Sequence, residues 1–132
     1  MRGQPWPVAM LIAMMCLVRF GLAAYGHAMP VALMEQLAAA ASDNVQMPYI
    51  IRVWAIRDMA LAVLVVTARP GTIKPLLIAC IVVDASDMLS AWLGHRAGLF
   101  TYDDMLSLMT TAVAALVPEI LALALITRSR RT

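Results

Sequence analysis

The stretch RVWAIRDMALAVLVVTARPG, residues 52–71, decides the fold. Most of it is apolar, and it approaches the ~20 residues that a helix needs to cross a bilayer. It closes with Arg69-Pro70-Gly71, and a helix ends readily there because the residue before a proline avoids helical geometry. Arg57 and Asp58 nevertheless lie inside it, where a charge costs a few kcal/mol unless it meets a partner or water. The stretch therefore predicts a membrane helix whose charged side chains face other helices.

The composition of the whole chain agrees with a membrane environment. Of its 132 residues, 63% are hydrophobic and 14% are charged. A soluble domain is about half apolar and about a quarter charged, so a soluble fold would leave too much apolar surface in water. The length suits one compact domain. We therefore expect residues 1–132 to form a single integral domain in the lipid bilayer.

Four hydrophobic segments are separated by turn-forming residues. Pro5 and Pro7 precede the first, and proline is tolerated at a helix start. Gly94, a common helix terminator, is expected to end the third. Thr101 and Asp104 have capping-box spacing at the start of the fourth. The prediction is an all-α fold, a bundle of four transmembrane helices at residues 8–25, 48–68, 75–93 and 102–126.

A shorter segment lies between the first two helices. Residues 29–42 are too few to span a bilayer. Their apolar positions suit a short interfacial or re-entrant helix. It would open at Pro30 and run through Val31, Met34, Leu37 and Ala41.

Loop charges predict an orientation. One side of a four-pass topology holds Arg2, Arg69, Lys74, Arg128, Arg130 and Arg131. The other side holds Arg96 together with Glu35, Asp43, Asp103 and Asp104. Because Lys and Arg are enriched in cytoplasmic loops, we expect a multi-pass protein of the cell (inner) membrane with both termini in the cytoplasm. The net charge of +2 is too small to indicate nucleic-acid binding.

Each predicted transmembrane helix carries ionisable residues inside it. At ~1.5 Å per residue, most of them lie between the middle of the bilayer and its outer face. Asp84 and Asp87, three positions apart, share one face of the third helix. Arg52 lies nearer the interface, where a long side chain can reach water. We expect a buried layer made of Arg19, Arg57, Asp58, Asp84, Asp87 and Glu119.

Carboxyl groups outnumber arginines in this layer. With all of them ionised, the layer would carry net negative charge in a low dielectric, which is unfavourable. Either Arg52 joins the layer, or one carboxyl group keeps its proton, with Asp84, Asp87 and Glu119 as candidates. A buried neutral acid can serve as a general acid. The predicted catalytic residues are Asp58 and Asp84, and the predicted binding residues are Arg19, Arg57, Asp87 and Glu119.

No metal or cofactor is predicted. Asp84 and Asp87 have a spacing that could share a cation, but arginines are expected beside them. His27 and His95 fall on the outer side and suit solvated loops better than metal or haem ligation. The sequence contains no phosphate-binding loop and no Ser-His or Cys-His arrangement.

Three short motifs stand out: residues 52–60, Val83-Asp84-Ala85 and Arg19-Phe20-Gly21-Leu22. They resemble motifs of an uncharacterised family of small four-helix integral membrane proteins, a domain of unknown function. That family has an Arg-x-x-x-x-Arg-Asp motif in its second helix and an aspartate in its third. The resemblance covers most of the chain and implies the fold and the importance of Arg57, Asp58 and Asp84. It implies no activity.

Three functions stay open on the sequence alone. The first is a polar pocket for a lipophilic small molecule, with acid–base chemistry of an isomerase or cyclase type. The second is an accessory or structural subunit, in which the charges hold the bundle together and its lipid-facing surface docks a larger membrane complex or a second copy of the chain. The third is a proton- or ion-coupled transporter. The charged layer is central to each of them.

Overall fold

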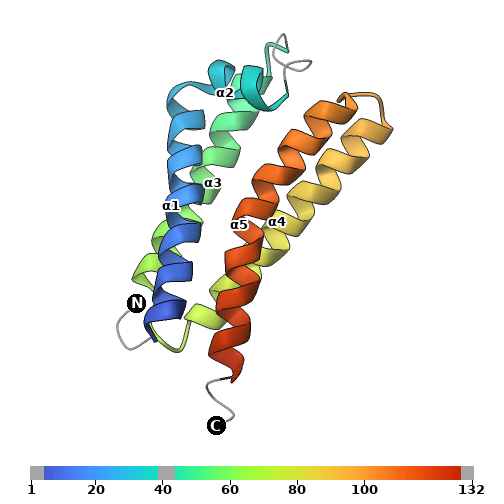
Figure 1. Cartoon of the computed structure of the whole chain (residues 1–132). Helices are drawn as coiled ribbons and strands as arrows, with labels where there is room; N and C mark the ends of the chain where they lie inside the picture. The colour runs from blue at the N-terminus through green and yellow to red at the C-terminus, as the bar shows by residue number, and fades with distance from the viewer. Residues whose placement is uncertain (1–4, 39–43, 129–132) are drawn as a thin grey trace.

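The computed structural model describes residues 5–38 and 44–128, which form five helices and, within those ranges, no strand (Figure 1). The all-α class is therefore confirmed. Each long helix begins and ends within three residues of its expected bounds, and the short second helix lies where Pro30 predicts it. The helices are α1 (Trp6–Ala28), α2 (Pro30–Leu37), α3 (Met47–Thr67), α4 (Ile73–Arg96) and α5 (Tyr102–Arg128).

Local sequence sets most helix starts. Proline occupies one of the first two positions of α1, α2 and α3, where its missing N–H would have no helical partner. The capping box before α5 is confirmed. The backbone N–H of Thr101 donates to Asp104 Oδ2 (3.2 Å), and that of Asp104 donates to Thr101 Oγ1 (3.1 Å). These two bonds satisfy N–H groups that the helix start would leave free.

The prediction that Gly94 ends the third long helix is wrong. α4 continues to Arg96, and the turn that follows uses Gly98, whose φ of 76° favours glycine. A Cβ at position 94 would lie 2.6 Å from the ring of Phe100. Gly94 is therefore required for close packing of Phe100 against the helix, a contact that local sequence does not reveal.

The four long helices are arranged as two pairs. α1 packs against α3, and α4 packs against α5, while α1 and α5 join the pairs. Figure 1 shows the pairs diverging toward the end that carries α2, with the start of α1 and the end of α5 at the opposite end. α2 lies across the divergent end and contacts α1, α3 and α5.

A continuous apolar core fills the end of the bundle where α1 begins and α5 ends. We call this region the packed half. The side chains come from α1, α3, α4 and α5, so all four long helices meet here. Its buried members are Val8, Ile12, Met15, Cys16, Ala62, Val65, Ile73, Leu77, Cys80, Ala122 and Ile126.

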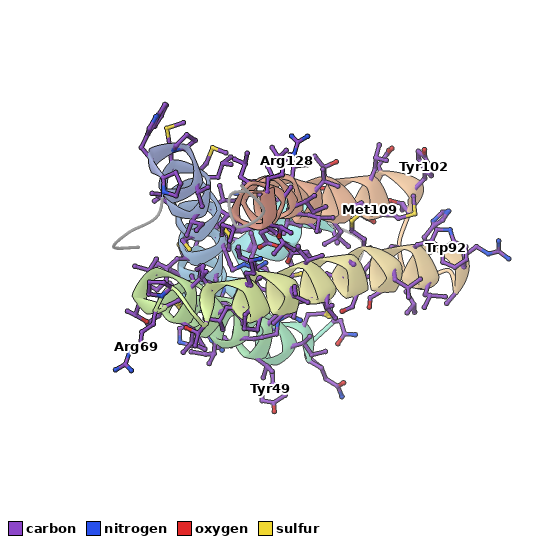
Figure 2. The ribbon with its side chains drawn as sticks, turned by 90° about the horizontal axis from the view of Figure 1, so that it is seen from below. Tyr49, Arg69, Trp92, Tyr102, Met109 and Arg128 are labelled. Atoms are coloured by element: carbon purple, nitrogen blue, oxygen red, sulfur yellow. The ribbon has the colours of Figure 1, made fainter. Side chains whose placement is uncertain are left out.

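The outer surface of the bundle is apolar. Many large apolar side chains are exposed, for example Leu17 at 75%. Tyr49, Trp92 and Tyr102 project outward from the ribbon (Figure 2). Within the described residues, α1, α4 and α5 are long and apolar enough to cross a membrane. The structure thus suggests a membrane protein.

The orientation prediction uses some residues that the structure does not describe. Arg2, Asp43, Arg130 and Arg131 lie outside the described residues, as does Ala41 of the predicted short helix. Of the basic residues expected on the cytoplasmic side, Arg69, Lys74 and Arg128 are described.

Candidate functional site

Arg19 is the centre of the charged groups. Its side chain leaves α1 and is buried, with 3% of the residue exposed. Nη1 donates to Asp58 Oδ1 on α3 (3.0 Å), and Nη2 donates to Asp84 Oδ1 on α4 (2.7 Å) and to Glu119 Oε1 on α5 (2.8 Å). One guanidinium group therefore links all four long helices. Hydrogen bonds of this charge-assisted kind are among the strongest in proteins.

Arg57 forms a second, more accessible centre. Its Nε donates to Asp58 Oδ1 (3.2 Å). Its Nη1 and Nη2 donate to the two oxygens of Asp87 (3.2 and 2.6 Å), a bidentate pair between α3 and α4. The side chains of Arg57 and Asp87 are 37% and 30% exposed. The structure thus joins two guanidinium and four carboxyl groups, and we call these six residues the charge cluster.

All six residues predicted for the buried layer belong to this cluster. Asp84 and Asp87 are one helical turn apart on α4. Asp84 meets Arg19, and Asp87 meets Arg57. Arg52 lies outside the cluster, as expected, because its exposed Nε donates to the backbone oxygen of His27 (3.3 Å).

Three buried polar atoms of the cluster have no hydrogen-bond partner among the described residues. They are Arg19 Nε, Asp84 Oδ2 and Glu119 Oε2. A buried polar group without a partner costs about 1–3 kcal/mol, so such groups are uncommon in folded proteins. Asp58 differs, since its Oδ1 accepts from both arginines.

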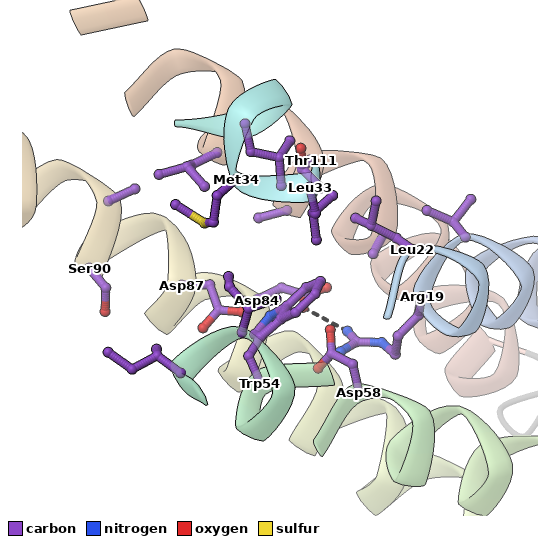
Figure 3. Close-up of a pocket in the computed structure, with 18 of the residues that line it drawn as sticks. Arg19, Leu22, Leu33, Met34, Trp54, Asp58, Asp84, Asp87, Ser90 and Thr111 are labelled. Carbon is purple, nitrogen blue, oxygen red and sulfur yellow. Dashed lines mark hydrogen bonds and ion pairs between the residues drawn. The ribbon is translucent and has the colours of Figure 1, made fainter. Parts of the chain in front are cut away.

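A cavity of about 290 Å³ borders the cluster on the side of α2. Arg19, Asp58, Asp84 and Asp87 contribute to its wall, and most of the remaining lining is apolar. In Figure 3, Arg19 points toward Asp58 and Asp84, and Leu22, Leu33 and Met34 lie across the cavity from them. The volume is close to the lower limit of small-molecule sites, about 300 Å³.

The cavity reaches the outer surface of the bundle. Ile50 on α3 and Ser90 on α4 both line it and are both exposed, so it opens between these two helices. On the other side, Val18, Leu22 and Thr111 also line a surface groove between α1 and α5. A molecule in the surrounding phase could therefore reach the charge cluster without crossing the packed half.

The sequence did not predict the role of α2 as a cover. Leu33 and Met34 of this helix are buried, and both line the cavity. Gly26 makes the cover possible, because a Cβ there would lie 2.6 Å from Leu33 and 3.3 Å from Trp54. A glycine four positions before the helix-opening Pro30 was the signal available in the sequence.

The histidines and acidic groups do not form a metal-binding arrangement. Within residues 5–38 and 44–128, no group of three or more His, Cys, Asp or Glu side chains is placed to hold a metal ion. His95 Nδ1 lies 3.0 Å from the backbone oxygen of Phe100, and its ring meets Tyr102 edge to face. His95 therefore helps to hold the turn between α4 and α5.

Comparison of the chain with known protein families, curated proteins and solved structures found no match. The resemblance to a family of small four-helix membrane proteins stays a prediction. The geometry of the charge cluster and the cavity is therefore the observation that bears on function.

Proposed function

We propose that the chain is a multi-pass protein of the cell (inner) membrane in which all four long helices cross the bilayer. α1, α4 and α5 meet the requirements of length and apolarity directly. Both termini would be cytoplasmic, with α2 at the outer interface. The outward Tyr49, Trp92 and Tyr102 near the α2 end would then anchor the bundle at the interface.

α3 belongs with the membrane-crossing helices although it carries more charge. Its 21 residues are enough to span. Asp58 is buried and bonded to both arginines, and Arg57 is paired with Asp87, so the internal charges are compensated. The segment 59–67 that follows has no charged residue.

The function supported best is binding of a lipophilic small molecule. One observation carries it: a mainly apolar cavity that is open to the side ends on a charge cluster. An apolar pocket with a few convergent polar groups is the usual form of a small-molecule site. The polar end of the ligand would meet Asp84 and Asp58, and its apolar part would lie under Leu33 and Met34.

Acid–base chemistry on this ligand is a second candidate, favoured by Asp84, which lines the cavity and whose buried Oδ2 has no hydrogen-bond partner among the described residues. A carboxyl group in this wall is placed to exchange a proton with a bound molecule, as isomerisation or cyclisation requires. The oxygen of Asp58 that Arg19 and Arg57 share is already bonded twice. Asp84 is thus the better candidate for proton transfer, and Asp58 would position the arginines.

The binding proposal is tested by fluorescence quenching in nanodiscs of a zwitterionic lipid. Trp54 lines the cavity, and Trp6→Phe with Trp92→Phe leaves it as the sole tryptophan of three. Brominated decanol quenches tryptophan on contact. We expect saturable quenching that Ala112→Phe abolishes, because Ala112 lines the cavity.

The control is Val113→Phe, which adds similar volume at the neighbouring exposed position of α5. It should leave the saturation curve unchanged. Quenching that never saturates and is equal in both variants would show simple partition into lipid and would refute the binding proposal.

The other two functions have their own tests. Affinity purification from native membranes supports an accessory subunit if a stoichiometric partner co-purifies. Proton or ion flux in proteoliposomes supports a transporter if Asp84→Asn and Glu119→Gln abolish it.

A further inference from the structure

The charged wall of the cavity has an excess of negative groups. The charge cluster contains four carboxyl groups and two guanidinium groups, so with all of them ionised the negative charges exceed the positive by two. At the cavity itself the imbalance is similar, since Arg19 is accompanied by Asp58, Asp84 and Asp87. A bound positive charge would offset this excess in a low dielectric.

The hydrogen-bonding capacity of the wall points the same way. Ser90 and Thr111 are the hydroxyl residues that line the cavity. Their hydroxyl protons are used within their own helices, donated to the backbone oxygens of Ser86 (2.7 Å) and Ser107 (2.9 Å). They therefore offer acceptor oxygens to the cavity.

Asp84 adds the acceptor that most needs a partner. Oδ2 is buried and has no donor within the described residues, while Oδ1 is held by Arg19. An ionised carboxylate accepts hydrogen bonds and donates none. The carboxyl groups and the two hydroxyl oxygens thus make this wall rich in acceptors, and a ligand here should bring N–H or O–H donors.

The remaining lining suits the body of such a ligand. Trp54 supplies an aromatic ring, whose face attracts a cation by up to ~2 kcal/mol where water is excluded. Leu22, Leu33 and Met34 supply apolar surface. The opening between α3 and α4 lets a tail longer than the cavity extend into lipid.

We infer that the cavity selects a cationic amphiphile, with its ammonium group against Asp84 and Asp87 and its apolar chain beneath α2. This inference rests on the proposed binding function and names the ligand class. A bare metal ion fits poorly, because it would leave the apolar lining unused and needs several oxygen ligands. A long-chain amine suits both parts of the wall, because its ammonium group meets the carboxyl groups and its chain meets the apolar lining.

The experiment compares three probes with one tail. Decylammonium, decanol and decanoate displace brominated decanol from the chain whose sole tryptophan is Trp54, in the same zwitterionic nanodiscs. Because the tail is constant, the head group alone changes. We expect decylammonium to bind about tenfold more tightly than decanol, a difference of ~1.4 kcal/mol, and decanoate to bind most weakly.

Variants then locate the charge effect. Asp84→Asn should weaken decylammonium binding about tenfold and change decanol binding less than about twofold. Asp87→Asn is the second variant, since its half-exposed side chain is less coupled to folding. Glu35→Gln removes an exposed carboxylate of α2 outside the cavity lining and should change nothing. Size-exclusion chromatography confirms that each variant is folded.

The outcomes separate this inference from the binding proposal. If brominated decanol quenches saturably but decanol or decanoate competes as well as decylammonium, the charge inference is wrong and the pocket stands. If decylammonium binds tightly and neither aspartate variant weakens it, the assigned carboxylates are wrong. If no probe gives saturable binding, the binding proposal itself fails.

Discussion

The two halves of the bundle are built from the same four helices but are filled differently. In the packed half, Ile12, Met15, Leu77 and Cys80 are completely buried against one another. In the half beneath α2, which we call the hollow half, the helix pairs diverge around the cavity lined by Leu22, Leu33 and four members of the charge cluster. The cluster lies between the two halves.

The difference shows that side chains can be buried both where helices pack closely and where a cavity is left between them. Ala62 and Ala122 are small and fully or nearly fully buried, which lets helices approach closely in the packed half. Arg19 then ties four helices together at one level. Beyond that level the pairs need not touch, because α2 covers the gap.

The largest expected effect comes from Arg19→Met. It would leave three buried carboxyl groups without their shared partner, and breaking a buried ion pair costs about 3–5 kcal/mol. Thermal unfolding in detergent measures the loss. Arg57→Met removes a half-exposed side chain and should cost about 1 kcal/mol or less. Equal losses for both would contradict the central place of Arg19.

The second-largest effect is expected when a leucine is shortened to alanine, and it should differ between the two halves. Leu77→Ala leaves a void in the packed half and should cost about 2 kcal/mol or more. Leu22→Ala enlarges a cavity that already exists, so fewer contacts are lost and the cost should be about 1 kcal/mol or less. Equal decreases in the thermal unfolding midpoint for the two variants would contradict this difference between the halves.

A smaller effect is expected at the cover of the hollow half. Gly26→Ala would press on Leu33 and Trp54, and overpacking of this kind costs about 1–3 kcal/mol. Ligand binding should weaken with it, as read from Trp54 quenching. Gly21 is the matched control on the same helix, since a Cβ there meets no atom within 4 Å. Gly21→Ala should leave binding unaltered, and a loss there would implicate helix flexibility instead.

The smallest effect is one of chemical access, with no change in stability. Cys16 and Cys80 are buried in the packed half and should resist a small thiol reagent in the folded protein. Ala112→Cys on the cavity wall should be modified, and bound decanol should slow its modification. Mass spectrometry counts the labelled thiols. Rapid labelling of Cys80 would show that the packed half opens.

The sequence was enough to predict the members of the charge cluster. Charges inside apolar segments must meet partners, and without any coordinates that rule gathers all six residues: Arg19, Arg57, Asp58, Asp84, Asp87 and Glu119. It could not predict which arginine is central. That choice depends on how each helix is rotated and how high it sits beside its neighbours, and periodicity within one helix does not fix either quantity.

The cavity was beyond prediction for a related reason. An empty volume has no residue pattern of its own, and it follows here from the divergence of two helix pairs. Gly94 illustrates the limit. Its sequence context suggests a helix end, whereas Phe100, six positions later, is the neighbour that requires it. Such contacts are decided by packing in three dimensions.

α2 contributes to the cavity wall but supplies no member of the charge cluster. The residues that anchor the fold and those that shape the cover are thus on different parts of the chain. Mutations at Leu33, Met34 or Leu37 can change the shape of the site while the Arg19 network is preserved. Under the proposed binding function, α2 is therefore the segment in which ligand preference can diverge during evolution at the least risk to the fold.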